Sequence, residues 1–429
     1  MKWLKYPLAF VVIAGLLFLS LILVAMIPRS AIQAQIEASA GYLNINPRNF
    51  VYVVEGAECS RIDQYADSVL LNVTYFFESD HPVESVLWAN YYERDYEPQP
   101  RDLLAAVKGD GAANTQYLRY WHGSIVPVRL FHLIGDIHGL YVFHGVLISV
   151  LLLWILILLF RHGLKIEAVA LIISMIAVNL WFVPLCLEYT WMFLVCLTAS
   201  IIAVCLSLRG KDPGLLFLIT GIVAAFLDFL TTETITLVIP LLLSLRIGMR
   251  QGEAHPWQKV TQCCILWGIG FVGMWTLKWG LAAAILRINV LPYLESSFEY
   301  HLHIESDMTP LRFALDSIMR NVNNLFPIGY GIVGKVAVLL GLVAVIVLIY
   351  RNSISMRENI NNCAVALYLL LGTVPYIRYV AIRFHAWYHY FFTYRAQAAT
   401  VMALCFAIAE VVRVNRKPTH TEPMPVSAE

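Results

Sequence analysis

The sequence predicts an all-α, polytopic membrane protein with about ten transmembrane helices and a long first outer loop. Of its 429 residues, 59% are hydrophobic and 14% are charged, whereas a soluble domain has about 45–50% apolar and about 25% charged residues. The mean hydropathy is +0.68. The 22 Tyr and 11 Trp are typical of aromatic belts at membrane interfaces. A formal net charge of +1 excludes a protein that binds nucleic acid through bulk electrostatics.

Ten segments reach or approach the length of a membrane span. A helix needs about 20 mostly apolar residues to cross about 30 Å of hydrocarbon. The first segment is longer than the h-region of a signal peptide, about 7–15 residues, so we expect an uncleaved anchor. The fifth and sixth are so close that we expect a tight hairpin. The predicted spans are approximately Tyr6–Ile27, Gly139–Phe160, Ile166–Pro184, Tyr189–Leu208, Pro213–Phe229, Thr232–Leu245, Val260–Leu286, Ile328–Tyr350, Cys363–Val380 and Phe391–Val412.

The basic residues predict the orientation of these spans. Short cytoplasmic loops carry an excess of Lys and Arg, and fourteen of the 30 basic residues fall in six alternating junctions. Both termini are therefore predicted to be cytoplasmic. The residues are Lys2 and Lys5; Arg161 and Lys165; Arg209 and Lys211; Arg246, Arg250 and Lys259; Arg351 and Arg357; and Arg413, Arg416 and Lys417.

Four regions follow from this topology. Residues 1–27 form the cytoplasmic start and first span, and residues 28–138 form a long outer loop. Residues 139–412 form a nine-helix region with a second outer loop at 287–327, and residues 413–429 form a disordered cytoplasmic tail. Because a structureless loop of this length is unusual, the first outer loop is expected to fold. Its runs SRIDQYADSVLLNVTYFF and RYWHGSIVPVRLFHLIGDIH have the amphipathic spacing of interfacial helices.

Two acids in the first outer loop are the candidate catalytic residues. Asp63 and Asp67 lie four residues apart, and on a helix they would share one face. Ser60 is a candidate N-cap for that helix. Such a pair can act as a general base or hold a divalent cation such as Mg²⁺ or Mn²⁺ against a phosphate. The alternative is an ordinary solvated helix face.

Basic residues gather near the last predicted span, in the run PYIRYVAIRFHAWYHYFFTYR. Guanidinium groups bind phosphates through forked donors, and neighbouring aromatic rings suit an amphipathic ligand. The run therefore predicts a site for a lipid phosphate, with an interfacial aromatic belt as the alternative. Lys278 and Lys335, near span ends, are expected to snorkel to the interface. The predicted phosphate-binding residues are Arg378, Arg383, Arg395, His385 and His389.

Secondary candidates lie near two other links. Asp228 and Glu233 flank the turn between the fifth and sixth spans, where acids at membrane depth are functional candidates. His301 and His303 form a His-x-His in the second outer loop, but without a third ligand no metal site is predicted. The sequence has no P-loop, dinucleotide fingerprint, nucleophile elbow or HExxH helix. These absences disfavour an ATP-driven machine.

The layout resembles the GT-C class of integral-membrane glycosyltransferases. The resemblance rests on one span, a long outer loop with early acids and then many spans, together with IDQYADSVLLN, YLRYWHGSIVPVRLF, LDFLTTETITLVIPL and FHAWYHYFFTYR. It implies transfer of a sugar from a polyprenyl-phosphate carrier to a saccharide, lipid or protein acceptor at the outer face of a bacterial cell envelope. It also implies a carboxylate base in the first outer loop. Asp63 and Asp67 are the best matches, and Glu55 and Glu58 come earlier.

Three other functions use the same features. A transporter or flippase for a lipid-linked saccharide would use the same arginines and aromatic residues. A glycan polymerase or ligase would depend more on the second outer loop, through His301, His303, Arg312 and Arg320. A non-catalytic assembly protein would use its outer loop for docking. The acids and bases predicted at depth cluster outside, which favours an enzyme open to the outer leaflet.

Overall fold

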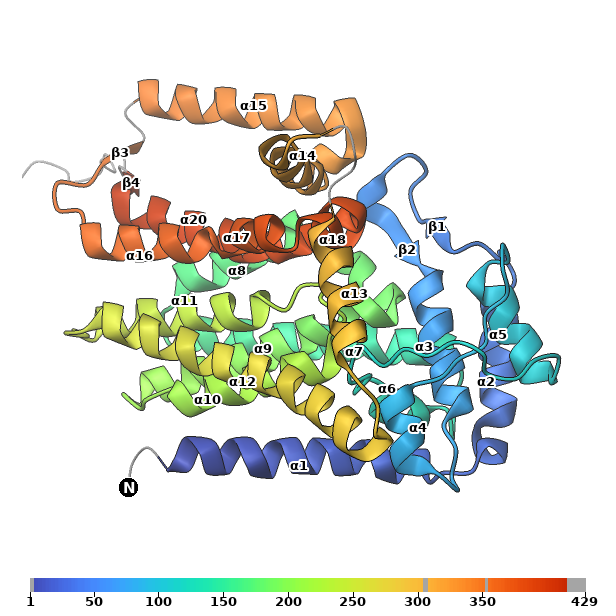
Figure 1. Ribbon diagram of the computed structural model, residues 1–429. Coiled ribbons are helices and arrows are strands. Elements are labelled where there is room, and N and C mark those ends of the chain that lie inside the picture. Colours follow the sequence, from blue (N-terminus) through green and yellow to red (C-terminus); the bar gives the residue numbers. More distant parts are fainter. Residues whose placement is uncertain (1–3, 304–307, 352–353, 415–429) are drawn as a thin grey trace, which may run out of the picture.

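The computed structural model describes residues 4–303, 308–351 and 354–414. These residues are almost wholly helical (Figure 1). Seven helical segments among them are long and apolar enough to cross a membrane, which confirms a helical multi-pass membrane protein. The segments are Lys5–Ala25, Ile137–Arg161, Leu187–Leu208, Pro256–Leu286, Ile328–Tyr350, Asn362–Ala381 and Tyr390–Val411.

All ten predicted spans are mostly helical in the structure, but three of them contain no helical segment long enough to cross a membrane. These are α8 (Lys165–Ala177), α10 (Gly214–Leu227) and α11 (Ile235–Arg250). At about 1.5 Å per residue, each is shorter than the hydrocarbon layer. The count of ten spans therefore stays a prediction. The remaining bundle helices are α1 (Lys5–Ala25), α7 (Ile137–Arg161), α9 (Leu187–Leu208), α12 (Pro256–Leu286), α15 (Gly331–Tyr350), α16 (Asn362–Gly372), α17 (Val374–Ala381) and α20 (Ala398–Val411).

The short helices are stable in the bundle because neighbouring helices bury them. Nearly all of α11 is buried, so its ends need no contact with lipid. Helix α10 packs along α12 at two glycines: a Cβ on Gly221 would come within 2.1 Å of the Trp267 carbonyl oxygen, and one on Gly270 within 2.4 Å of that of Leu218. Small residues permit such close approach of helix backbones.

One predicted span is broken. The segment Ile166–Pro184 was expected to be continuous, but α8 ends at Ala177 and a 3₁₀ helix, η2, follows at Leu180–Leu185. The link residue Asn179 has a φ of +53°, a left-handed conformation that asparagine adopts more readily than most residues. Pro184 lies inside η2 and cannot donate a backbone hydrogen bond. The break allows α9 to begin at Leu187, beside residues 28–136.

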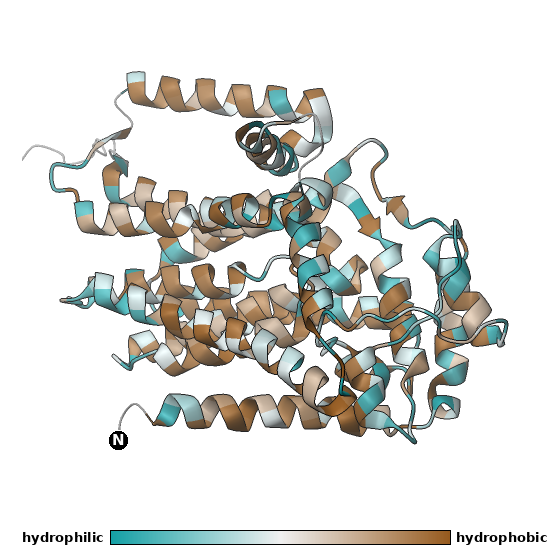
Figure 2. Ribbon diagram, in the orientation of Figure 1, coloured by the Kyte–Doolittle hydropathy of each residue, from teal (hydrophilic) through white to brown (hydrophobic). Residues whose placement is uncertain are grey.

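Residues 28–136 fold into a separate group of elements at one end of the bundle, which we call the end unit (Figure 1). Polar residues are frequent in it, whereas α1 and α15 are apolar along most of their length (Figure 2). Its position outside the cell stays a prediction. Its elements are α2 (Arg29–Leu43), β1 (Phe50–Tyr52), the 3₁₀ helix η1 (Glu58–Ser60), β2 (Arg61–Asp63), α3 (Gln64–Phe76), α4 (Pro82–Trp88), α5 (Gln99–Lys108) and α6 (Ile125–Phe131), with β1 and β2 paired antiparallel.

Two local predictions for the end unit need correction. The run from Arg119 to His138 was expected to be one amphipathic helix, but α6 covers only its middle. The N-cap of α3 is Asp63, whose side chain accepts the Ala66 N–H. Ser60 instead bonds to the backbone of Val54. Aspartate caps a helix as well as serine does.

Buried basic side chains fasten the end unit to the bundle. Arg129 donates hydrogen bonds to the Ile27 carbonyl at 2.7 Å and to the Thr74 carbonyl. Lys278 was expected to snorkel, but it is fully buried in α12 and its ammonium donates to the Leu87 carbonyl at 3.0 Å. That carbonyl lies in the last turn of α4, where backbone acceptors lack helical partners. The lysine thus anchors α4 to the bundle.

The basic junctions lie at the opposite end of the bundle from the end unit. The N-terminus of α1 and strands β3 (Ile354–Met356) and β4 (Val412–Val414) are found there (Figure 1). Lys5 approaches Asp212 at 3.9 Å, and β3 pairs antiparallel with β4. The orientation across the membrane stays a prediction. From residue 415 onward, the predicted disordered tail lies outside the described residues.

The remaining elements are short or peripheral. Helix α15 is strongly apolar and little buried, and in Figure 1 it lies at the edge of the bundle beside α14. The others are α13 (Leu291–Leu302), α14 (Pro310–Val322), α18 (Arg383–Tyr388), α19 (Tyr390–Thr393) and the 3₁₀ helices η3 (Ile328–Tyr330) and η4 (Tyr394–Gln397).

Candidate functional site

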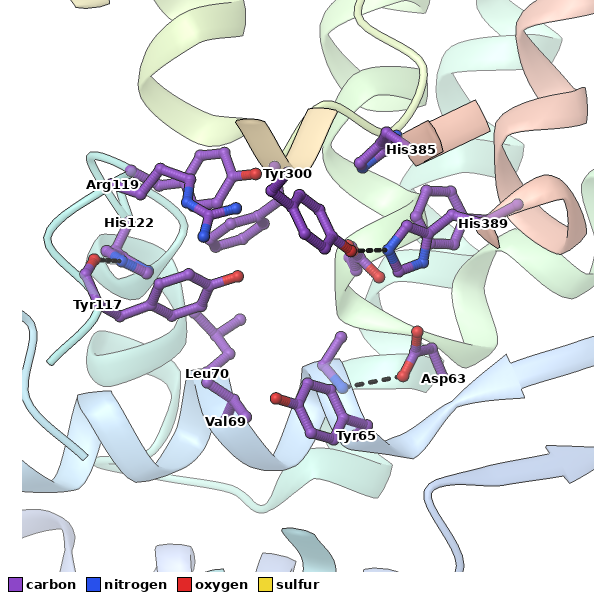
Figure 3. Close-up of a pocket in the computed structure, with 15 residues that line it drawn as sticks. Asp63, Tyr65, Val69, Leu70, Tyr117, Arg119, His122, Tyr300, His385 and His389 are labelled. Carbon is purple, nitrogen blue, oxygen red and sulfur yellow. Dashed lines mark hydrogen bonds between the residues drawn. The ribbon is translucent and has the colours of Figure 1, made fainter. Parts of the chain in front are cut away.

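A cavity lies where the end unit meets the bundle (Figure 3). Six segments that are distant in sequence contribute to its wall. They are the start of α3, residues 117–122, the first turn of α9, the link after α10, the end of α13 and residues 385–392. Acidic, basic and aromatic side chains therefore face one space. We call it the central cavity.

Asp63 is the predicted catalytic residue that lines the central cavity. Its Oδ1 accepts the Ala66 N–H at 2.9 Å, and Figure 3 shows the carboxylate below His389. Burial raises the pKa of Asp63 to about 7, and the charge of Asp67 adds to the shift, whereas the Ala66 hydrogen bond opposes it. A carboxyl with this pKa can accept a proton near neutral pH.

The backbone around Asp63 is held from the bundle side. The Tyr189 hydroxyl donates to the Arg61 carbonyl at 3.0 Å. Arg395 and Tyr394 both donate to the Cys59 carbonyl, at 3.3 and 3.2 Å. These bonds tie η1 and β2 to α9 and η4, so the position of Asp63 is set by two bundle elements.

Arg61 forms a second tie between β2 and the bundle. Its guanidinium carbon lies 3.6 Å from the ring centre of Phe50 and 4.0 Å from that of Phe391. A guanidinium between two aromatic faces gains cation–π attraction on both sides. The strand that leads into Asp63 is therefore fastened to α19.

Asp67 lies behind the cavity wall and does not line it. It is fully buried: Oδ2 accepts the Tyr141 hydroxyl at 2.5 Å, and Oδ1 accepts the Leu187 N–H at 2.9 Å. Burial raises the pKa of Asp67 to about 7, against the effect of the Tyr141 hydrogen bond. The structure thus separates the predicted pair into one carboxylate that faces the cavity and one that joins α3 to α7 and α9.

Arg119 provides the positive charge of the central cavity, and the sequence analysis missed it. No other arginine or lysine lines the cavity among the described residues. The guanidinium lies 5.3 Å from the ring centre of Tyr300, and in the described part of the chain it forms no ion pair with an acid. Figure 3 shows it across the cavity from Asp63. It is therefore available to an anionic ligand.

Three cavity histidines are neutral at physiological pH. Burial is the main cause in each case: it lowers the pKa of His122 and of His389 to about 3, and that of His385 well below its usual range. Within the described part of the chain, each leaves its Nδ1 without a hydrogen-bond partner. His389 Nε2 lies 3.4 Å from the Tyr300 hydroxyl. These rings can donate or accept hydrogen bonds without adding charge.

The structure does not bring the three predicted phosphate-binding arginines to the cavity. Arg378 pairs with Glu233 at 2.8 Å and also donates to the Leu230 carbonyl. Arg383 donates to the Leu302 carbonyl at 3.2 Å. Arg395 is fully buried, with its guanidinium carbon 4.4 Å from the Tyr189 ring centre. Of the predicted cluster, His385 and His389 line the cavity.

The secondary candidates have structural contacts of their own. Asp228 accepts the Thr231 N–H and hydroxyl, the latter at 2.5 Å. His301 bonds to the Ser297 carbonyl at 2.6 Å, and His303 packs on the Phe384 ring. Across residues 4–303, 308–351 and 354–414, no three His, Cys, Asp or Glu are grouped to hold a metal ion.

Glu188 is a second acid of the cavity that sequence reasoning missed. It lies in the first turn of α9 and lines the cavity, and its Oε2 is buried with no hydrogen-bond partner among the described residues. The available signal was an acid at the end of an apolar segment, the same signal that singled out Asp228 and Glu233. Tyr117 and Arg119 precede the YWHG run, and no spacing rule marks them as site residues.

Two further hollows adjoin the central cavity. One, of about 650 Å³, lies between residues 116–119 and helices α12 and α13, and it shares Tyr117 and Arg119 with the cavity. We call it the helix-side hollow. The other, of about 1030 Å³, is lined mainly by residues 93–99 and shares Tyr65. We call it the polar hollow, since acids, amides and hydroxyls form most of its wall.

Comparison with known proteins adds no relative: no family model, curated protein or solved structure matches the chain.

Proposed function

We propose that this protein is a GT-C-like membrane glycosyltransferase that moves a sugar from a polyprenyl-phosphate carrier to an acceptor at the outer face of a bacterial cell membrane. One observation carries the proposal. Asp63 and Arg119 face each other across the central cavity (Figure 3), and neither is neutralised there by an ion pair within the described residues. A base and a phosphate-binding cation are the two groups that such a transfer needs.

Asp63 would act as the general base. It would take the proton of the acceptor hydroxyl as that oxygen attacks the anomeric carbon of the donor sugar, while the bond from that carbon to the phosphate oxygen breaks. The carrier leaves as polyprenyl phosphate, and the configuration at the anomeric carbon inverts. A positioned base contributes about 10²–10⁴-fold to such a step, and a pKa of about 7 suits it to neutral pH.

Arg119 would bind the phosphate and stabilise the charge that develops as it leaves. A guanidinium offers forked donors that match phosphate oxygens. The surrounding Tyr117, Tyr300 and His389 add neutral donors. Stabilisation of the leaving group by fixed donors in a partly dry cavity is often the largest catalytic contribution. This assignment moves the phosphate site from Arg378, Arg383 and Arg395 to Arg119.

The helix-side hollow supports a lipid-linked donor. It opens beside Trp279 of α12, an apolar helix long enough to cross a membrane. Nearby, Leu291 and Phe298 on α13 are exposed. A polyprenyl chain lying along α12 and α13 would bring its phosphate to Arg119, which belongs to both spaces. A water-soluble nucleotide sugar would not need such an apolar border.

The test follows the release of polyprenyl phosphate from a panel of polyprenyl-phosphate sugars, with purified protein in lipid vesicles and an acceptor-containing membrane extract. Asp63→Asn is the central variant, because asparagine caps a helix as well as aspartate does but cannot take the proton. Asp80→Asn, at an exposed acid of the end unit, is the matched control.

We expect release by the wild type and by Asp80→Asn, and a loss of about 10²–10⁴-fold in Asp63→Asn. If Asp63→Asn still releases polyprenyl phosphate at the wild-type rate, Asp63 is not the general base. If no donor is consumed, while a fluorescent lipid-linked saccharide crosses the vesicle membrane, the protein is a flippase.

A further inference from the structure

We propose that the polar hollow binds the acceptor, and that this acceptor is a saccharide of neutral or positive charge. The inference rests on the proposed function, because it gives the second substrate of that reaction a place and a class. The hollow lies in the end unit, between residues 93–99, Asn49 and the segment Asn114–Thr115. The helix-side hollow adjoins the central cavity at other residues, Tyr117 and Arg119.

The polar hollow and the central cavity are neighbours at Tyr65. This residue lines both spaces, and Figure 3 shows its ring at the cavity edge near Asp63. Tyr65 is the second residue of α3, directly after the N-cap Asp63 and Gln64. A ligand seated in the hollow can therefore extend one hydroxyl past Tyr65 toward the proposed base.

A buried amide in the wall of the polar hollow lacks a partner. Gln99 is 1% exposed; its Nε2 donates to Glu93 at 3.1 Å, and its Oε1 accepts no hydrogen bond from any residue that the structure describes. Leaving a buried acceptor unfilled is unfavourable. A ligand hydroxyl would supply the missing donor. Since the site presents mainly acceptors, its ligand should be rich in donors, as a saccharide is.

An aromatic ring stands at the same hollow. Tyr96 is fully exposed, at 104% of its reference area, and has a φ of +65°. Ligand sites commonly combine aromatic side chains with a few convergent polar groups. The apolar face of a sugar ring can stack on tyrosine while its hydroxyls reach the carboxylates and amides.

The charge of the hollow selects against anions. Glu93, Asp95 and Glu97 line it together with Arg94, and Arg94 is already paired with the buried Asp102 at 2.7 Å. Asp95 forms no ion pair in the described part of the chain. Like charges close together repel strongly in a partly buried site. Uronate- or phosphate-bearing acceptors are therefore excluded, whereas hydroxyl and amino sugars fit.

The experiment measures saccharide binding without any donor, so it does not depend on transfer. Full-length protein in nanodiscs is exposed to an array of soluble neutral, amino and uronate tetrasaccharides that includes maltotetraose, tetraglucosamine and tetragalacturonate, with a tetralysine peptide beside them. The variants are Tyr96→Ala and Asp95→Asn. The matched controls are Tyr52→Ala and Asp80→Asn, two exposed residues of the end unit outside the hollow.

We expect binding of neutral or amino members and none of tetragalacturonate. Tyr96→Ala should weaken binding about tenfold, and Tyr52→Ala should not. Asp63→Asn should keep binding while it loses transfer, which separates the two proposals. The inference is overturned if no member of the array binds, if uronates or tetralysine bind best, or if Tyr96→Ala changes nothing. If saccharides bind but no sugar transfer is detected with any donor, the saccharide-binding site is supported and the glycosyltransferase function is wrong.

Discussion

Buried or half-buried charges occur at both ends of this helix bundle, but they are arranged in opposite ways. At the end away from the end unit, Arg246 of α11 pairs with Glu167 of α8 at 2.9 Å and with Glu410 of α20 at 2.6 Å. Arg250 adds a contact to Glu167 at 3.2 Å. At the central cavity, Asp63 and Arg119 stand apart across an open space. The first group joins three helices, and the second leaves its charges available.

The difference indicates which buried charges serve folding and which serve a ligand. A paired charge has already been compensated within the protein, so removing one partner leaves the other uncompensated. An unpaired charge that faces a cavity costs stability unless a ligand completes it. Such groups persist at functional sites. The predictions below test this division, from the largest expected effect to the smallest.

Arg246→Met should destabilise the protein strongly. It leaves Glu410 without its partner and Glu167 with only the partly exposed Arg250, and breaking a buried ion pair in this way costs about 3–5 kcal/mol. The measurement is the thermal melting of purified protein in detergent. Arg250→Met is the matched control: this arginine is 41% exposed and should lower the melting temperature much less. Adding Glu167→Gln to Arg246→Met should recover part of the loss, and no recovery would contradict the pairing argument.

Arg119→Met should show the opposite behaviour. Melting should stay at or above that of the wild type, since no ion pair is broken. Donor turnover in vesicles should fall about 10²–10³-fold, the usual effect of removing one group that stabilises developing charge. Arg383→Met, outside the cavity, is the control for turnover. If the wild type and Arg119→Met turn over equally, Arg119 does not bind the phosphate. The arginines near the last predicted span, Arg378 and Arg395, would then be the candidates again.

The fold followed from the sequence where apolar length and charge spacing decide the structure. The long spans, such as α1, α7 and α12, match their predicted segments within a few residues. The short helices and the break at Asn179 could not be predicted from the sequence. They depend on tertiary contacts that bury them, and residue spacing along the chain does not reveal those contacts. Gly221 against the Trp267 carbonyl is one such contact.

The site followed only in part, for a related reason. Asp63, His385 and His389 were singled out by residue type and position, and all three line the cavity. Arg378 and Arg395 share that chemistry, but Glu233 and the Cys59 carbonyl take up their donors. Arg119 and Glu188 were missed because the cavity joins six segments, and the meeting of those segments is a property of the fold.

The pH dependence of turnover should report Asp63. Since burial raises the pKa of Asp63 to about 7, the base is ionised above that pH and protonated below it. Turnover should therefore rise with pH, tenfold per unit below about pH 7, and level off above it. The residual turnover of Asp63→Asn should lack this inflection. A flat wild-type profile from pH 5 to 8 would contradict the assignment.

The raised pKa of Asp63 also affects the stability of the folded state. Stability should fall as pH rises, whereas turnover should increase. A carboxyl whose folded pKa exceeds its unfolded value favours the folded state fully at low pH, and this contribution is lost as pH rises through about 7. Asp63→Asn cannot ionise, so it should melt at a higher temperature than the wild type at pH 8 and at a similar temperature at pH 4. Asp80→Asn, at an exposed site, should show no such crossover in melting experiments.

The smallest effect should come from Tyr141→Phe, behind the cavity. The Tyr141 hydroxyl donates to Asp67 at 2.5 Å, and losing one such bond costs about 0.5–1.5 kcal/mol. Melting should fall slightly. Without this hydroxyl Asp67 holds its negative charge less easily, so it raises the pKa of Asp63 less and the pH midpoint of turnover should fall. Ser149→Ala, which removes a hydroxyl from the same helix far from Asp67, is the control. If Tyr141→Phe abolished turnover while melting stayed unchanged, Asp67 would belong to the reaction itself, and the separation of the acid pair into one working and one supporting carboxylate would be wrong.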